Sequence, residues 1–173
     1  MMDKIKILIV GAGAVGSYYG GRLAQNLDTS VAVVCRSDYE TVKQNGFDIK
    51  SIEGDFIFRP NGVFRSCAEY SDSPDYIIIT TKVLPEIDIV SNIRPAVKAN
   101  TSIVLIQNGI DIEKHIAAAF PNNELISGIA YIGTGRDGAG KVRHQGGGRL
   151  RFGLYPEGHS EKLDILVELF KKA

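Results

Sequence analysis

Short apolar runs alternate with longer amphipathic stretches along the first two thirds of the chain. The runs are rich in Val and Ile and are bounded by glycine or polar residues, so they predict strands buried on both faces of a parallel sheet. The stretches between them have helix length and polar ends, which predicts helices. The predicted strands are 5–10, 30–35, 75–80 and 102–106, and the predicted helices are 15–27, 37–45, 86–98 and 111–120.

Polar residues near the helix ends refine these boundaries. Ser37 or Asp38 is the expected N-cap of the second predicted helix, and Asp111 is the expected cap of the fourth, because a side-chain oxygen there can accept a hydrogen bond from a backbone N–H that has no partner. Pro85 suits the first turn of the third predicted helix, where its missing N–H costs nothing.

The last third of the chain has a different pattern. Stretches separated by glycines predict shorter strands at 125–133, 141–145 and 149–153. The segment 160–172 carries apolar residues at helical spacing and predicts an amphipathic helix. A hairpin is expected around Glu53 and Gly54. Together these elements predict an α/β fold with a doubly wound, mainly parallel sheet, helices on both faces, and an antiparallel extension near the C-terminal end.

Composition and charge narrow the functional classes. The chain has 173 residues with 20 basic and 20 acidic side chains, so its formal net charge is zero. This balance argues against a nucleic-acid-binding surface, which needs a basic stripe. No run approaches the ~20 apolar residues of a membrane helix. Cys35 and Cys67 have no metal-ligand spacing and favour a reducing, cytoplasmic setting. We therefore expect one domain without a metal, a membrane or nucleic acid as partner.

The stretch from Gly11 to Gly16, after the first predicted strand, matches G-x-G-x-x-G. A helix and a second strand follow it, which is the context that a dinucleotide-binding loop requires. Gly11 allows the tight turn, Gly13 lets the backbone approach a pyrophosphate, and Gly16 lets helix and strand pack closely. The N–H groups of the loop and helix start, including those of Ala14 and Val15, then face the phosphates. The pattern predicts a Rossmann-type nucleotide site.

The residues after the second strand indicate which dinucleotide is bound. NAD sites place an acidic residue there for the ribose 2′-hydroxyl, but this chain has Arg36 and Ser37. A guanidinium can bind a 2′-phosphate through two hydrogen bonds and can stack on adenine. The sequence therefore predicts NADP(H) as the cofactor.

The stretch from Ile7 to Arg36 resembles the opening of the ketopantoate reductase (2-dehydropantoate 2-reductase) family. Three later motifs extend the resemblance over the whole chain. Thr80-Thr81-Lys82 is similar to the family's Thr-x-Lys or Thr-Lys element, and Gln107-Asn108-Gly109 is similar to its Gln/His-Asn-Gly. The segment 143–150 is similar to its His-x-Gly-x-Gly-x-Leu hairpin.

The resemblance implies the reduction of ketopantoate to pantoate by hydride transfer from NADPH, on the route to coenzyme A. It implies that Lys82 contacts the cofactor near its nicotinamide-side ribose. It also implies that Asn108 contacts the nicotinamide ribose and helps to place the substrate hydroxyl, as the one residue here with a catalytic positioning role. His144 falls in the hairpin and is expected to be structural.

The family's catalytic lysine and its substrate-binding glutamate belong to an all-helical C-terminal domain. We therefore expect 1–173 to be an N-terminal NADP-binding domain, with helix 160–172 leading toward that second domain. Such a chain would bind NADP(H) but not turn over a 2-keto acid, and any homo-oligomer would form through the second domain.

One position departs from the family. Pro85 stands where some members carry a glutamine that helps to bind the 2′-phosphate, so the strength of the preference for NADP over NAD stays open. Two other interpretations also stay open: the cofactor domain of another NADP-dependent 2-keto or hydroxy-acid dehydrogenase, and a non-catalytic NADP(H)-sensing module.

Overall fold

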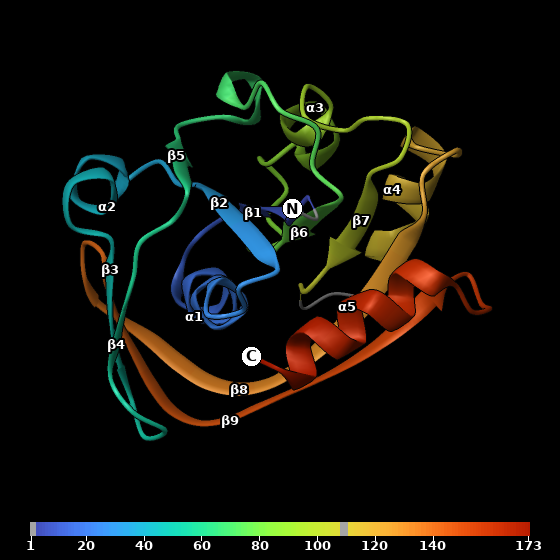
Figure 1. The fold of residues 1–173 in the computed structure, drawn as a ribbon. Coiled ribbons are helices and arrows are strands. Elements are labelled where there is room, and N and C mark those ends of the chain that lie inside the picture. Colours follow the sequence, from blue (N-terminus) through green and yellow to red (C-terminus); the bar gives the residue numbers. More distant parts are fainter. Residues whose placement is uncertain (1–2, 108–110) are drawn as a thin grey trace.

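The computed structural model describes residues 3–107 and 111–173. Within these residues, nine strands form one sheet in the order β4-β3-β9-β8-β7-β6-β1-β2-β5 (Figure 1). The strands are β1 Ile5–Val10, β2 Thr29–Val34, β3 Phe47–Ser51, β4 Phe56–Phe58, β5 Gly62–Phe64, β6 Tyr76–Ile79, β7 Ser102–Leu105, β8 Leu125–Gly138 and β9 Lys141–Tyr155. The helices are α1 Ala14–Ala24, α2 Tyr39–Asn45, α3 Ile89–Ile93, α4 Ile112–Ala119 and α5 Glu161–Lys171, with a 3₁₀ turn, η1, at Cys67–Glu69.

The centre of the sheet is parallel, as the apolar runs predicted. β1 pairs with β2 on one side and β6 on the other, and β6 continues to β7 and β8. Ile7 and Ile9 point into one core cluster, whereas Leu8 and Val10 point into the other. Both faces of β1 are therefore buried. The chain continues from β1 to β2 on one side and from β6 to β7 on the other, so the boundary between β1 and β6 is the switch point at which such sheets form a crevice.

Helices cover both faces of the curled sheet. α1 and α5 supply side chains to the core on the inner face, and α3 and α4 supply them to the core on the other face. Figure 1 shows α1 enclosed between β2 and the sweep of β8 and β9. Gly20 and Gly21 allow this close approach, since a Cβ on either would lie 3.1 Å or less from Ile9 or Phe56 side-chain atoms.

The C-terminal strands are longer than the sequence predicted. Instead of three short strands, β8 and β9 form one antiparallel hairpin of 14 and 15 residues. Glycines interrupt the pairing without ending it: Gly147 has φ +76°, and the register shifts between Tyr131 and Ile132. A Cβ on Gly147 would overlap the Tyr131 carbonyl. The prediction was wrong because the glycines form bulges.

The third predicted helix is also shorter than expected. α3 begins after Asp88, whose carboxylate accepts a hydrogen bond from Ser91 N at 3.0 Å, so Pro85 lies outside it. Pro95 follows its end, where the missing N–H prevents continuation. The remaining predicted helices are present with shifted ends, and Ser160 caps α5 through Leu163 N at 3.1 Å.

Two expected caps do not form, although both residues occupy the N-cap position. Asp38 makes no capping hydrogen bond to α2. Asp111 has φ +61°, makes no capping bond to α4, and forms an ion pair with Lys114 at 2.9 Å. β5 and η1 were not predicted, because three-residue edge elements carry little periodic signal. No helix in the described ranges has the length and apolarity to cross a membrane.

Candidate functional site

A cavity of about 1220 Å³ opens at the carboxyl ends of the central parallel strands. Residues that follow β1, β2, β6 and β7 line it, and the distal part of β8 closes one side. The main lining segments are 10–15, 34–38, 65–67, 80–84, 106–107 and 134–136. Open α/β sheets bind ligands in this position, because backbone groups and loop side chains converge there.

The three glycines of the loop have different surroundings. Gly11 has φ +91°, and a Cβ there would overlap the Thr81 side chain. A Cβ on Gly16 would overlap Thr80 Oγ1 and lie 2.8 Å from Gly11 O. For Gly13, the nearest atom would be Gly11 O at 3.9 Å, and its φ of −80° suits any residue. Folding therefore requires Gly11 and Gly16, whereas Gly13 leaves open space beside the cavity.

Hydrogen bonds fix the loops around the glycines. Thr80 Oγ1 donates to Gly11 O at 2.7 Å. Gln107 Nε2 donates to Thr81 O at 2.6 Å and to Thr81 Oγ1 at 3.0 Å. These hydrogen bonds hold the loops after β1, β6 and β7 together, so this part of the cavity wall is ordered without a ligand.

The lining has more basic than acidic side chains, and two of its four cations, Arg65 and Arg136, form ion pairs with Glu40 and Asp38. It contains Arg36, Arg65, Lys82 and Arg136, against the single carboxylate of Asp38 among its described residues. Arg36 and Lys82 are exposed and form no ion pair within the described chain. The guanidinium of Arg65 lies 3.9 Å from the Tyr39 ring centroid. This charge distribution suits an anionic ligand.

Asp38 does not leave an unpaired negative charge in this lining. Its side chain is about 6% exposed and forms an ion pair with Arg136 of β8. It also accepts hydrogen bonds from Gly140 N and Ser37 Oγ, each at 3.0 Å. No local pattern predicts this contact, because Asp38 and Arg136 are 98 residues apart.

Most of the sequence-predicted site residues meet at the cavity. Gly16 lies behind the loop against Thr80, and Pro85 is exposed and outside the lining. Asn108 lies outside the described residues. The predicted residues that line the cavity are Gly11, Gly13, Ala14, Val15, Arg36, Ser37 and Lys82. Arg65, Arg136 and Asp38 were missed as site residues.

His144 pairs with Thr134 of the cavity wall but is not itself among the residues that line the cavity, and its side chain is buried and hydrogen-bonded. It is 1% exposed and its ring lies 4.2 Å from the Tyr18 ring, centroid to centroid. Its Nδ1 is 2.8 Å from Ser51 Oγ and its Nε2 is 3.3 Å from Gly147 O. The Ser51 contact joins β3 to β9 and the ring packing joins β9 to α1, which agrees with the expected structural role.

Comparisons with known proteins match this fold and motif order. The family model described as "Ketopantoate reductase PanE/ApbA" matches residues 7–157. A 2-dehydropantoate 2-reductase of Nostoc sp. is 30% identical over 159 residues, covering 92% of this chain and 49% of that protein. One of Pyrococcus abyssi is 31% identical over 170 residues, covering 98% and 54%.

A solved structure gives the same result. The crystal structure of 2-dehydropantoate 2-reductase from Methylococcus capsulatus has a TM-score of 0.92 and 49% identity, covering 96% of this chain and 54% of that one. The chain thus spans about half the length of the curated relatives it matches. The family model covers most of the chain, including the glycine loop and the strands that form the cavity. The chain belongs to the ketopantoate reductase PanE/ApbA family of oxidoreductases.

Proposed function

We propose that residues 1–173 form the NADP(H)-binding part of a 2-dehydropantoate 2-reductase. The observation that carries this proposal is the open space at Gly13, which faces a basic cavity beside the start of α1. The fold itself does not require a glycine at this position. A ligand that must lie close to the protein backbone there explains why a side chain is absent.

The lining residues fit a dinucleotide phosphate. The N-terminus of α1 carries no acidic residue in its first turn, so its N–H groups and partial positive charge suit the pyrophosphate. Arg36 would bind the 2′-phosphate with help from Ser37. The ion pair with Arg136 occupies Asp38, and this removes most of the repulsion that a free carboxylate would exert on that phosphate.

When bound, the cofactor supplies a hydride to the keto carbon of the substrate. In this proposal Lys82 holds the nicotinamide-side ribose, while Asn108 contacts that ribose and positions the substrate hydroxyl. In this proposal the proton donor, a lysine, and a substrate-binding glutamate come from the second, helical half of a family-length enzyme. We therefore propose that residues 1–173 alone bind NADP(H) without reducing ketopantoate.

Calorimetric titration with NADPH and NADH tests the cofactor. We expect NADPH to bind at least tenfold more tightly, which corresponds to about 1.4 kcal/mol. Arg36→Gln should remove this difference by weakening NADPH alone. Arg59→Gln, an exposed arginine outside the cavity, is the matched control. Equal affinity of the unmodified chain for the two cofactors would refute the role of Arg36.

A steady-state assay with ketopantoate and NADPH tests the second statement. No turnover above background is expected from residues 1–173. Measurable turnover would show that this part carries its own proton donor. If a family-length enzyme reduced other 2-keto acids but not ketopantoate, the chain would be the cofactor domain of another NADP-dependent dehydrogenase. If it bound NADP(H) but reduced no 2-keto acid, the interpretation as an NADP(H)-sensing module would be favoured.

A further inference from the structure

Arg65 is a basic residue of the cavity that belongs to none of the sequence motifs. It follows β5, which pairs in parallel with β2 so that Phe64 lies opposite Val34. Cys35 N donates to Phe64 O at 3.0 Å, so this pairing continues past the end of β2. Neighbouring strands lie about 4.8 Å apart. Arg65 and Arg36 therefore leave adjacent strand ends at the same edge of the sheet, and both line the cavity.

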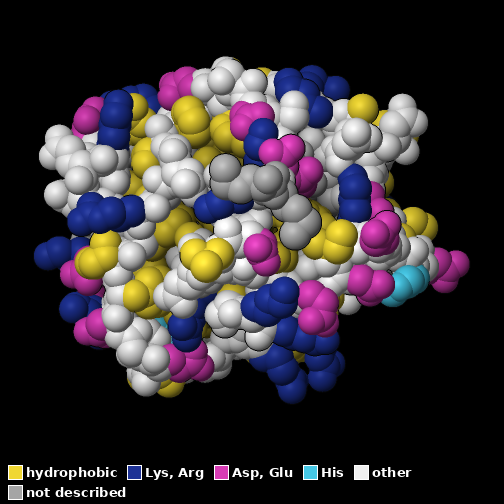
Figure 2. Space-filling model, in the orientation of Figure 1, with side chains coloured by type: hydrophobic (Ala, Val, Ile, Leu, Met, Phe, Trp, Pro, Cys, Tyr) yellow, Lys and Arg dark blue, Asp and Glu magenta, His cyan; other side chains and the backbone are white. Residues whose placement is uncertain are grey.

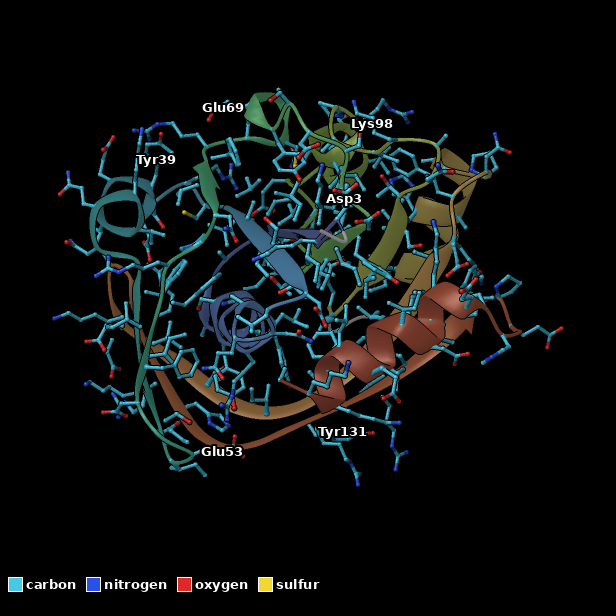
Figure 3. The ribbon with its side chains drawn as sticks, viewed as in Figure 1. Asp3, Tyr39, Glu53, Glu69, Lys98 and Tyr131 are labelled. Atoms are coloured by element: carbon cyan, nitrogen blue, oxygen red, sulfur yellow. The ribbon has the colours of Figure 1, made fainter. Side chains whose placement is uncertain are left out.

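Contacts with two elements hold Arg65 in place. Its backbone N–H donates to Glu69 Oε2 of η1 at 2.9 Å. Its guanidinium lies 3.9 Å from the centroid of the Tyr39 ring and donates a hydrogen bond to the Glu40 carboxylate of α2. Figure 3 labels Tyr39 and Glu69, the two residues between which these contacts place Arg65. The backbone and the guanidinium of Arg65 are thus fixed by different neighbours.

The ion pair between Arg65 and Glu40 is exposed. The two side chains are 52% and 68% exposed, and such a pair contributes little to stability because water screens both charges. The cavity lining includes Arg65 but not Glu40, so the guanidinium borders the cavity and the carboxylate lies outside it. The pair of Arg136 with Asp38 differs, because the Asp38 carboxylate is buried and also binds the Gly140 N–H. Of the two paired arginines, Arg65 is the one that a ligand can draw away from its partner.

Positive and negative side chains are mixed around this end of the cavity. On the α2 side of the molecule, at the left of Figure 2, Lys and Arg side chains alternate with Asp and Glu side chains. Burial raises the pKa of the Cys35 thiol to about 11, Asp38 adds to this rise, and the positive charges of Arg136 and Arg65 oppose it. Both guanidiniums thus act on the end of β2. An anion that binds there meets a carboxylate already paired with each of them.

We propose that Arg65 is a second ligand of the adenosine 2′-phosphate and that Glu40 competes with this phosphate for the Arg65 guanidinium. A phosphate monoester carries about two negative charges at neutral pH, and it accepts two parallel hydrogen bonds from a guanidinium. It is therefore a stronger partner than the exposed carboxylate. The Tyr39 ring remains against the guanidinium during the exchange and favours its charged, planar group there. Resting on the proposed NADP(H) site, this role gives the 2′-phosphate a further partner in a chain where Pro85 replaces the glutamine of some family members.

Calorimetric titration of the 173-residue chain with NADPH and NADH tests the contact, because the two cofactors differ only in the 2′-phosphate. Arg65→Gln should weaken NADPH binding at least tenfold and leave NADH binding unchanged. The matched control is Arg94→Gln, an exposed arginine outside the cavity whose guanidinium lies 4.9 Å from the Phe120 ring centroid. It should change neither affinity. Unchanged NADPH binding in Arg65→Gln, or equal weakening of both cofactors, would overturn the contact.

The double change Glu40→Gln and Arg65→Gln separates a direct contact from simple neutralisation of Glu40. It removes one charge of each sign, so the net charge of the chain is kept. A direct contact predicts that the double variant binds NADPH about tenfold more weakly than the unmodified chain. Equal NADPH affinity of the two would show that Arg65 only neutralises Glu40, and would overturn the proposal. The backbone bond of Arg65 to Glu69 does not involve the substituted side chain, and urea unfolding checks that each variant is folded.

Glu40→Gln alone tests the competition. Without the carboxylate, NADPH should bind about threefold more tightly, with NADH unchanged. Glu168→Gln, which removes another exposed carboxylate from an ion pair outside the cavity, should have no effect. NADPH binding that is no tighter in Glu40→Gln would overturn the competing role of Glu40.

The outcomes also separate this role of Arg65 from the proposed function. If the unmodified chain prefers NADPH and Arg36→Gln removes the preference, but the Arg65 variants bind NADPH normally, the NADP(H) site stands and the role of Arg65 is wrong. Equal affinity of the unmodified chain for NADPH and NADH would instead refute the proposed cofactor preference itself.

Discussion

Adding one methyl group at two positions of the glycine loop separates the requirements of folding from those of ligand binding. Gly13→Ala adds a Cβ with no atom nearer than 3.9 Å. Its backbone is extended, at φ −80°, so the expected cost is limited to the weaker N-cap preference of alanine, at most about 1 kcal/mol. The added methyl group should, however, occupy the space that we assign to the pyrophosphate, and it should therefore weaken NADPH binding.

Gly16→Ala should behave in the opposite way. Its Cβ would overlap Thr80 Oγ1 and lie 3.1 Å from Ile9 Cγ2, and overpacking of this kind costs about 1–3 kcal/mol. Loss of the hydrogen bond from Thr80 to Gly11 O adds about 1 kcal/mol. The better helix propensity of alanine offsets up to about 1 kcal/mol. The net loss in free energy of unfolding should be about 1–3 kcal/mol.

Urea unfolding and NADPH calorimetry on the same samples measure the two effects. Gly13→Ala should unfold nearly as the unmodified chain does but bind NADPH at least tenfold more weakly, a loss of about 1.4 kcal/mol. Gly153→Ala, where nothing lies within 4 Å of the added Cβ, controls for an added methyl outside the cavity. If Gly13→Ala is folded and binds NADPH normally, the role given to the open space is wrong.

Two further predictions concern buried groups of the cavity wall. Asp38→Ala leaves Arg136 and the Gly140 N–H without their partner, so urea unfolding should show a loss of about 1–3 kcal/mol in the free energy of unfolding. The control Asp48→Ala removes only an exposed ion pair and should change this free energy by less than about 0.5 kcal/mol. Equal effects of the two changes would contradict a stabilising role of the buried Asp38 carboxylate. Burial raises the pKa of the Cys67 thiol to about 11 from an ordinary value of 9.0, so this thiol ionises at a lower pH in the unfolded chain than in the folded one. The stability that the neutral thiol contributes is therefore complete below about pH 9 and falls as the pH rises toward 11. Between about pH 8 and 10.5 this thiol should account for a loss of order 2 kcal/mol. The free energy of unfolding of Cys67→Ala should therefore fall by about that much less than in the unmodified chain, although burial also raises the pKa of Cys35 to about 11 and its loss stays in both; identical pH profiles would rule out a titrating thiol at Cys67.

Local patterns in the sequence were enough to predict the parallel centre of the fold. A strand buried on both faces, such as Ile5–Val10, must be apolar at nearly every position, and this is visible in six consecutive residues. The glycine loop that follows was visible because its motif lies within six consecutive residues, although the side chains that exclude a Cβ at Gly11 and Gly16 are those of Thr81 and Thr80, far away in sequence. The position of Arg36 at the cavity follows from these two elements.

Contacts between distant segments decided the rest. The bulges at Gly146 to Gly148 keep β9 continuous only because β8 lies opposite them, so the glycines by themselves predicted a break. Asp38 was predicted as a helix cap, but Arg136 of β8 and Gly140 of the β8–β9 turn contact it instead. The sequence determined which residues form the nucleotide loop and the fold class. The tertiary structure decided which charges surround that loop, because these depend on contacts such as that of Asp38 with Arg136, 98 residues apart.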